Sequence, residues 1–112
     1  MSVYVSNIVI EQGYDFETTF QMENTATNSP LDLTAATAEG QLRKHYGSSA
    51  AVSFASTIPD PGAGTITISL TNTQTVDLKP GRYVYDVKIV YSGGKEYKAV
   101  EGAALVRAGV TR

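Results

Sequence analysis

Apolar and polar residues alternate with a period of two along much of the chain. The clearest stretches are residues 14–22, 64–70 and 82–91, where nearly every second side chain is apolar or aromatic. Successive side chains of a β-strand point to opposite faces of a sheet, so this spacing predicts strands with one buried face. The side chains expected to face the core are Tyr14, Phe16, Thr18, Phe20, Met22, Ile66, Ile68, Leu70, Tyr83, Tyr85, Val87, Ile89 and Tyr91.

Four further strands are indicated with less regular patterns. Residues 2–10 form the first, and a change of phase at Ser6 and Asn7 suggests a bulge there. Residues 52–56 begin another strand. Residues 95–107 form a long last strand, in which Gly102 marks a bulge or a close approach of another backbone. Residues 34–46 are read as a strand with Ala36, Ala38, Gly40 and Leu42 inward, although their alanine content also suits a helix.

Turn-forming residues separate these segments at short intervals. A loop is expected over residues 24–32, and tight turns are expected over residues 12–13, 47–49, 59–64, 79–82 and 92–95. In the last of these, Gly93 and Gly94 permit positive φ at both corners. Thr71 followed by Gln74 matches a capping box, which predicts one short helical turn near residues 72–77.

About seven strands and one helical crossover in 112 residues predict an all-β, immunoglobulin-like β-sandwich, with residues 1–112 forming a single domain. Composition agrees, because 30 residues are β-branched Thr, Val or Ile, which pack well on pleated sheets. Gly81 and Tyr83 match the tyrosine corner of such sandwiches, in which the Tyr hydroxyl binds backbone a few residues upstream. We therefore interpret Gly81 and Tyr83 as a structural corner.

Several classes of function find no support in the residues. The chain has no Cys, so it has no disulfide framework, thiol nucleophile or zinc-thiolate site, and His45 is its only His. We expect no enzyme activity, no catalytic residues, no cofactor and no metal site. A net charge of −2 argues against nucleic acid as a partner, and no stretch suits a membrane span. We see no signal peptide at the start of the sequence.

Two groups of residues are candidate partner contacts. Arg43, Lys44, His45 and Tyr46 combine charge, hydrogen-bonding groups and an aromatic ring beside a loop. They suit an acidic partner surface or a sugar, although basic residues also protect an edge strand from unwanted pairing. Tyr91 and Tyr97 flank the turn at residues 92–95, where they are either cross-strand neighbours or partner-facing side chains.

Charge is divided unevenly along the sequence. Residues 1–42 contain six acidic and no basic residues, whereas residues 43–112 contain nine basic and five acidic residues, giving −6 and +4. Strands from both halves interleave in most sandwiches, which would mix these charges. Alternatively, the division produces a dipolar surface suited to head-to-tail assembly.

The order of these features resembles small β-sandwich virion proteins of contractile-tailed bacteriophages, of the baseplate, tail-fibre or neck type. The segments that carry the resemblance are residues 13–16, 30–34, 41–44, 64–70, the crossover at 71–77, residues 81–87, Glu101 with Gly102, and residues 110–112. The resemblance implies a non-enzymatic structural protein that joins other virion proteins or further copies of itself in a ring or fibre. It also implies synthesis in the host cytoplasm and a final location in the virion. The alternatives are a host-surface, glycan-binding adhesin domain and a capsid-decoration protein.

Overall fold

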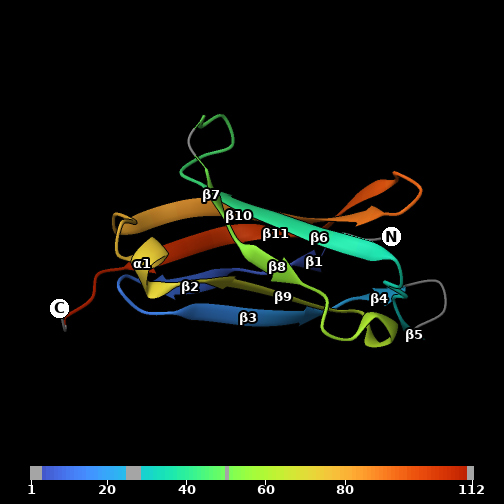
Figure 1. Cartoon of the computed structure of the whole chain (residues 1–112). Coiled ribbons are helices and arrows are strands. Elements are labelled where there is room, and N and C mark those ends of the chain that lie inside the picture. The colour runs from blue at the N-terminus through green and yellow to red at the C-terminus, as the bar shows by residue number, and fades with distance from the viewer. Residues whose placement is uncertain (1–3, 25–28, 50, 111–112) are drawn as a thin grey trace.

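The computed structural model describes residues 4–24, 29–49 and 51–110, and the side chains of residues 24, 29 and 30 are not described. Two β-sheets pack face to face in an elongated molecule of 45 × 28 × 22 Å (Figure 1). The expected all-β sandwich is therefore confirmed. The start of the first predicted strand at Ser2 and Val3, residues 25–28 of the predicted loop, and Thr111 and Arg112 lie outside the described residues.

The large sheet contains the longest strands. Its order is β1-β11-β10-β6-β7. β2 also pairs with β11, further along that strand than β1. Neighbouring strands are antiparallel except that β1 and β2 run parallel to β11. The bounds are β1 Tyr4–Val5, β2 Ile8–Glu11, β6 Ala36–Arg43, β7 Val52–Ser53, β10 Gly81–Tyr91 and β11 Glu96–Arg107.

The small sheet covers the inner face of the large one. Its antiparallel order is β3-β9-β8, with β3 Phe16–Gln21, β9 Thr65–Leu70 and β8 Ala55–Thr57. At one end of the sandwich, β4 Glu23–Asn24 pairs with β5 Ser29–Pro30, so part of the predicted loop over residues 24–32 forms a short two-stranded arm. The 3-10 helix η1, Pro61–Ala63, lies in the predicted turn 59–64, and α1, Asn72–Thr75, connects the two sheets.

The strand arrangement follows the immunoglobulin pattern with one departure. Strands β3, β9 and β8 take the places of B, E and D, and strands β6, β10 and β11 take those of C, F and G. In the constant-type arrangement the first strand joins the sheet of B, E and D. Here β1 and β2 instead join β11 in parallel, so the first and last strands of the domain hold each other.

The core consists of the inward side chains that alternation predicts. Every second residue is buried along β9 and, on β10, from Tyr85 to Ile89. Along β6 burial increases from Ala36 to Leu42, which confirms the strand reading of that segment. Tyr14 is an exception: it precedes β3 in a turn and is exposed. The buried hydrophobic residues are Ile8, Ile10, Phe20, Met22, Leu33, Leu42, Phe54, Ile66, Ile68, Leu70, Leu78, Tyr85, Val87, Ile89, Ala99, Val100, Ala104 and Val106.

Gly102 is the point where the first strand comes closest to the last. A Cβ atom at this position would lie 2.0 Å from the Ser6 carbonyl oxygen, so only glycine fits. The first strand is interrupted here into β1 and β2, and the Asn7 side chain accepts a hydrogen bond from the Ala103 amide at 3.1 Å. The close approach is confirmed, whereas the bulge of β11 lies at Ala99, because the register with β10 shifts between Val87 and Lys88.

The predicted single strand over residues 52–56 is wrong, because the chain changes sheets there. β7 pairs with β6 in the large sheet, and β8 pairs with β9 in the small one. Between them Phe54 is buried, with its ring 6.2 Å from that of Phe16 and 6.1 Å from that of Tyr85. Its amide donates to the Gly40 carbonyl at 2.9 Å. Phe54 thus anchors the crossing between the sheets.

The helix and the last hairpin differ in detail from prediction. The capping box is present, since the Thr71 amide donates to Gln74 Oε1 at 3.0 Å, but α1 ends at Thr75 rather than near residue 77. In the hairpin, the Tyr91 amide donates to the Lys95 carbonyl at 2.9 Å. Only Gly94 of the two hairpin glycines has positive φ, at +89°.

Candidate functional site

The predicted corner at Gly81 and Tyr83 contains the hydrogen bond that a tyrosine corner requires. The Tyr83 hydroxyl donates to the Lys79 carbonyl oxygen at 2.8 Å, four residues upstream. Lys44 Nζ lies 4.7 Å from the centre of the Tyr83 ring. Gly81 has φ of +146°, and a Cβ there would lie 2.8 Å from Lys44 Nζ. The corner therefore fixes the start of β10 and brings Lys44 beside it.

The predicted contact group at residues 43–46 is only partly free to bind a partner. Arg43 donates to the carbonyl of Ser48 and, at 2.9 Å, to Gln41 Oε1, so it holds the loop that follows β6. His45 Nδ1 lies 3.0 Å from the Ser48 hydroxyl. Tyr46 is 72% exposed. The structure thus gives Arg43 and His45 structural partners and leaves the Tyr46 ring at the surface.

The second predicted contact pair, Tyr91 and Tyr97, lies at the opposite end of β10. Their rings contact edge to face, with centroids 6.0 Å apart and planes inclined by 78°. The Tyr91 hydroxyl donates to the Asp32 carbonyl oxygen at 3.1 Å, and burial raises the pKa of Tyr91. Tyr97 remains 41% exposed. The two rings are therefore neighbours, as expected, and contact of either ring with a partner stays a prediction.

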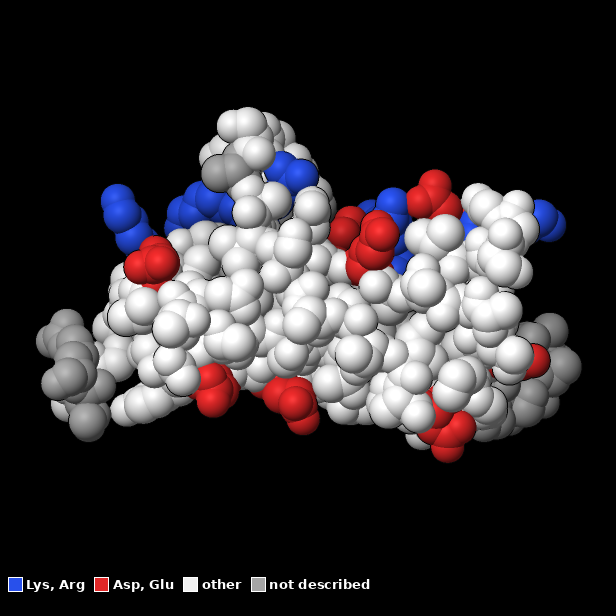
Figure 2. Space-filling model, viewed as in Figure 1, with Lys and Arg blue, Asp and Glu red and all other residues white. Residues whose placement is uncertain are grey.

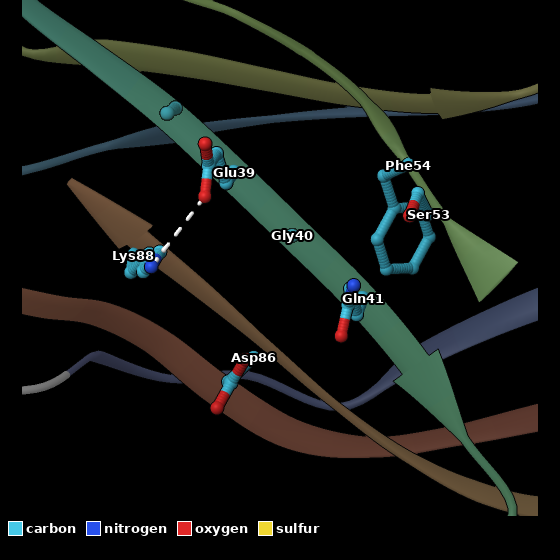
Figure 3. A pocket seen from close by; sticks show the side chains of 8 residues that line it. Glu39, Gly40, Gln41, Ser53, Phe54, Asp86 and Lys88 are labelled. Carbon is cyan, nitrogen blue, oxygen red and sulfur yellow. Dashed lines mark ion pairs between the residues drawn. The ribbon is translucent and has the colours of Figure 1, made fainter. Parts of the chain in front are cut away.

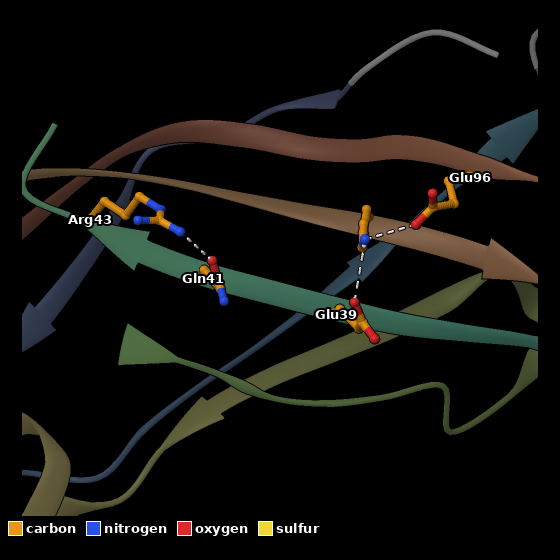
Figure 4. A network of polar contacts seen from close by, with 5 residues as sticks. Glu39, Gln41, Arg43 and Glu96 are labelled. Atoms are coloured by element: carbon orange, nitrogen blue, oxygen red, sulfur yellow. Dashed lines mark hydrogen bonds and ion pairs between the residues drawn. The ribbon is translucent and has the colours of Figure 1, made fainter. Parts of the chain in front are cut away.

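The outer face of the large sheet carries a network of ion pairs across three strands (Figure 4). Lys88 on β10 lies 3.5 Å from Glu39 on β6 and 2.7 Å from Glu96 on β11. The hydrogen bond that Lys88 donates to Glu96 raises the pKa of Lys88, and the charges of Glu96 and Glu39 add to the effect. All three side chains are well exposed, so the network aligns the strands more than it stabilises them.

A second set of pairs continues this network along the sheet. Lys98 on β11 lies 3.4 Å from Glu101 and 3.8 Å from Asp86 on β10. In the strand register Lys88 stands opposite Lys98, and Asp86 stands opposite Glu101. Each like-charged couple is therefore offset by the oppositely charged couple beside it.

A shallow trough runs beside these pairs (Figure 3). Its walls come from β6, β10 and the β7–β8 crossing, and it continues past Gln41 and Asp86 into a second hollow beside Tyr46. Hydroxyl, amide, carboxylate and ammonium groups line it. The lining residues of the two parts are Ala38, Glu39, Gly40, Gln41, Arg43, Tyr46, Ser53, Phe54, Val84, Tyr85, Asp86 and Lys88.

Folding mixes some of the charges that the sequence separates and leaves others apart. Glu39 pairs with Lys88, and Glu11 lies 3.4 Å from Arg107, so acidic residues of the first 42 positions reach basic residues of the rest. Figure 2 nevertheless shows Lys and Arg only along the upper part of the molecule, over the large sheet, whereas acidic side chains also occupy the lower edge. Folding therefore mixes part of the charge, and head-to-tail assembly through a dipolar surface stays a prediction.

Among residues 4–24, 29–49 and 51–110, no group of three or more His, Cys, Asp or Glu side chains is arranged to hold a metal ion. No helix in this part of the chain is long and apolar enough to cross a membrane. Burial, as the largest cause, raises the pKa of Tyr85 to about 12. Its hydroxyl donates to the Ser6 carbonyl, which is a structural use.

Sequence reasoning missed the ion-pair network and the trough. The signal for the network is the polar phase of β10, in which Asp86 and Lys88 alternate with core residues. The first three residues of β11, which include Glu96 and Lys98, are all exposed. The trough had no comparable signal, because it depends on the crossing at Phe54 and on the register of β6 against β10.

Comparisons with known proteins identify no family. No protein-family model and no curated protein matches the chain. Similar solved structures include an internalin-like protein from Listeria monocytogenes, 15% identical with a TM-score of 0.44, covering 96% of this chain and 28% of that one. A family 123 glycoside hydrolase from Clostridium perfringens is 12% identical with a TM-score of 0.45, covering 100% and 24%. A 2,6-sialyltransferase from Vibrionaceae Photobacterium sp. is 14% identical with a TM-score of 0.36, covering 96% and 18%.

The chain thus spans between 18% and 28% of the length of these structures. At such identities and TM-scores the similarities carry no argument about function.

Proposed function

We propose that this chain is a non-enzymatic structural module that joins subunits of a tailed-phage virion. One observation carries the proposal: the two predicted contact groups lie toward opposite ends of an elongated domain. Tyr46 projects from the loop after β6, near the start of β10, and Tyr97 lies beside the far end of β10. A module that connects two neighbours needs a contact at each end.

The chemistry of the described side chains supports a structural role over a reaction. His45 is engaged with Ser48 in the loop after β6. Asp15 accepts hydrogen bonds from the backbone and side-chain nitrogens of Asn72, at 2.7 and 3.0 Å, and so holds the start of α1. The phenol of Tyr85 is buried and bonded to backbone. The imidazole, carboxylate and phenol groups of these residues thus hold parts of the fold together.

Mass spectrometry of purified particles tests this function. Particles of a phage that encodes this chain are expected to contain it at a fixed ratio to the other tail or neck proteins. Its absence from intact particles contradicts the proposal. Electron microscopy of the same particles then separates a tail, baseplate or neck position from a place on the capsid surface, which would indicate a decoration protein instead.

The trough favours a second candidate, a domain that binds a glycan of the host surface. Sugars are bound by planar polar groups together with an exposed aromatic face, and Gln41, Arg43, Asp86 and Tyr46 line adjoining parts of the trough. A glycan array probed with the wild-type chain tests this candidate. Binding that is lost in Tyr46→Ala and kept in Tyr97→Ala supports it, and an array without signal for the wild type excludes it.

A further inference from the structure

An apolar hollow lies at the end of the molecule where β10 stops and β11 begins. Leu31, Tyr91, Lys95 and Tyr97 line it. Leu31 packs partly buried against the core, and Tyr97 stands beside Tyr91 with its ring half in solvent. Partly exposed tyrosine rings around a hollow are typical of residues that dominate protein–protein contacts. We call this feature the aromatic hollow.

Acidic residues lie at the same end of the molecule as the aromatic hollow (Figure 1). Asp32 is held beside Tyr91 by the bond from the Tyr91 hydroxyl to its carbonyl oxygen. Hydrogen bonds from Thr34 lower the pKa of Asp32, so the carboxylate is ionised at neutral pH. Glu23 follows Met22, and the Met22 carbonyl accepts a hydrogen bond from the Leu31 amide at 3.0 Å. Asp60 precedes Pro61, and the Pro61 carbonyl accepts a hydrogen bond from the Leu33 amide at 3.0 Å. Three acids, and Glu96 in its pair with Lys88, therefore share this end with Lys95.

The opposite end of the molecule has the complementary character. The Lys44 ammonium lies over the Tyr83 ring, and the Lys79 carbonyl oxygen accepts a hydrogen bond from the Tyr83 hydroxyl. Arg82 is an exposed residue of the same corner. Val76, in the segment between α1 and this corner, is 54% exposed. This end, which we call the basic corner, therefore combines three basic side chains with the apolar Val76 and one exposed acid, Asp77.

We propose that the aromatic hollow of one copy binds the basic corner of a second copy of this chain. This inference rests on the proposed structural function and names a further copy as the partner. Val76 of one copy supplies the apolar side chain for the hollow of the next, and Lys44, Lys79 and Arg82 face Glu23, Asp32 and Asp60. Opposite charge on the two surfaces fixes which ends meet and steers their encounter.

The geometry makes this contact intermolecular. β10 runs from Gly81 beside the basic corner to Tyr91 in the aromatic hollow. At about 3.3 Å per residue these eleven positions separate the two surfaces by roughly 30 Å. Because two different surfaces of each copy take part, the contact is heterologous. Copies joined this way form an open filament, or a ring where the rotation closes.

Charge reversal at each end tests the proposal. Lys79→Glu with Arg82→Glu makes the basic corner acidic, and Glu23→Lys with Asp60→Lys makes the surroundings of the hollow basic. Each double variant alone is expected to weaken self-association by about tenfold or more, because like charges then face each other. Mixing the two double variants is expected to restore association, since every end again meets an opposite charge. Sedimentation of the full-length chains in low salt measures this.

A matched control separates specific ends from overall charge. Glu17→Lys with Thr19→Lys makes the exposed face of β3 more positive without changing either end. This control is expected to associate like the wild type. Its mixture with the acidic-corner variant is expected to associate less than the mixture of the two charge-reversed variants, because the acidic corner still meets an acidic hollow on every copy. Circular dichroism confirms that each variant folds.

Three results would overturn the inference: a wild-type chain that stays monomeric in low salt at every concentration, double variants that associate as well as the wild type, or a mixture that fails to recover. None of these would remove the chain from purified particles, so the proposed function is judged separately.

Discussion

Gly102 is the residue at which a single added carbon atom has the largest structural consequence. Its hydrogen faces the Ser6 carbonyl, and a methyl group there would lie 2.0 Å from that oxygen and 2.8 Å from its carbon. Gly102→Ala must therefore push β1 away from β11. We predict a loss of about 1–3 kcal/mol in the free energy of unfolding, measured by urea denaturation.

Gly93→Ala is the matched control for this substitution. Gly93 lies in the β10–β11 turn, has no atom within 4 Å of a built Cβ and lacks positive φ. Its substitution is expected to change the free energy of unfolding by less than about 0.5 kcal/mol. Equal losses for the two variants would contradict the close approach at Gly102.

Tyr85 makes stability depend on alkaline pH. Burial raises its pKa in the folded chain to about 12, with a smaller opposing effect of its bond to Ser6 and a small further increase from Tyr4. An unfolded tyrosine has a pKa of about 10, so the folded state holds this proton more tightly. The contribution of Tyr85 is therefore complete below about pH 10 and is lost as the pH rises toward about 12.

We predict that the urea midpoint of the wild type falls more steeply over this range than that of Tyr85→Phe, which has no phenol to ionise. Tyr46→Phe removes an exposed phenol instead and is expected to keep the wild-type slope. Parallel curves for wild type and Tyr85→Phe would show that Tyr85 does not carry the effect.

Sequence could predict some of these residue roles and not others. Gly81 and Tyr83 are two residues apart, and the bond partner, the carbonyl of Lys79, is only four positions upstream of Tyr83, so a local pattern was sufficient. Tyr85 binds the Ser6 carbonyl, 79 positions away, through a strand pairing that no local pattern encodes. Local sequence reports a corner, whereas the strand order decides which distant groups meet.

At the scale of elements, Thr75 links the short helix to the strands. It is the buried polar residue of the described part, and its hydroxyl donates to the Tyr14 carbonyl at 2.8 Å and accepts from the Gly13 amide at 3.1 Å. Both bonds join α1 to the turn between β2 and β3. The crossover between sheets is thereby fixed to the start of the chain.

Thr75→Val keeps the shape of the side chain and removes both bonds. We predict a loss of about 1–3 kcal/mol in the free energy of unfolding, because the Gly13 amide and Tyr14 carbonyl lose their partner. Thr73→Val, at an exposed position of the same helix, is expected to change it by less than about 0.5 kcal/mol. A Thr75→Val chain as stable as the Thr73→Val chain would show that the helix is held by other contacts.

Strand alternation made most elements predictable, because one face of each long strand is buried. It failed where the chain changes sheets at Phe54, since β7 and β8 together keep one alternating pattern while pairing with different partners. It also failed at the first strand, because β1 and β2 keep the same register against β11 and the expected bulge at Ser6 and Asn7 is an interruption of the strand instead. Alternation reports burial and not which sheet supplies the neighbour.

At the scale of the whole molecule, the sequence predicted the total charge of each part of the chain but not where these charges lie on the folded surface. The net charge of −2 conceals an acidic first part and a basic second part. Pairs such as Glu39 with Lys88 cancel some of this within the large sheet. The acids around the aromatic hollow and the bases of the basic corner stay at opposite ends, which gives the domain polarity along its length.

The average mass of the wild-type chain in solution, measured against protein concentration at two salt levels, tests the central claim most directly. In about 0.02 M salt we predict that the mass rises above 11.9 kDa with concentration. In about 0.5 M salt, where charges at opposing surfaces are screened within a few ångströms, we predict a return toward the monomer. A mass of 11.9 kDa at every concentration and salt, or an association that salt leaves unchanged, would contradict the account.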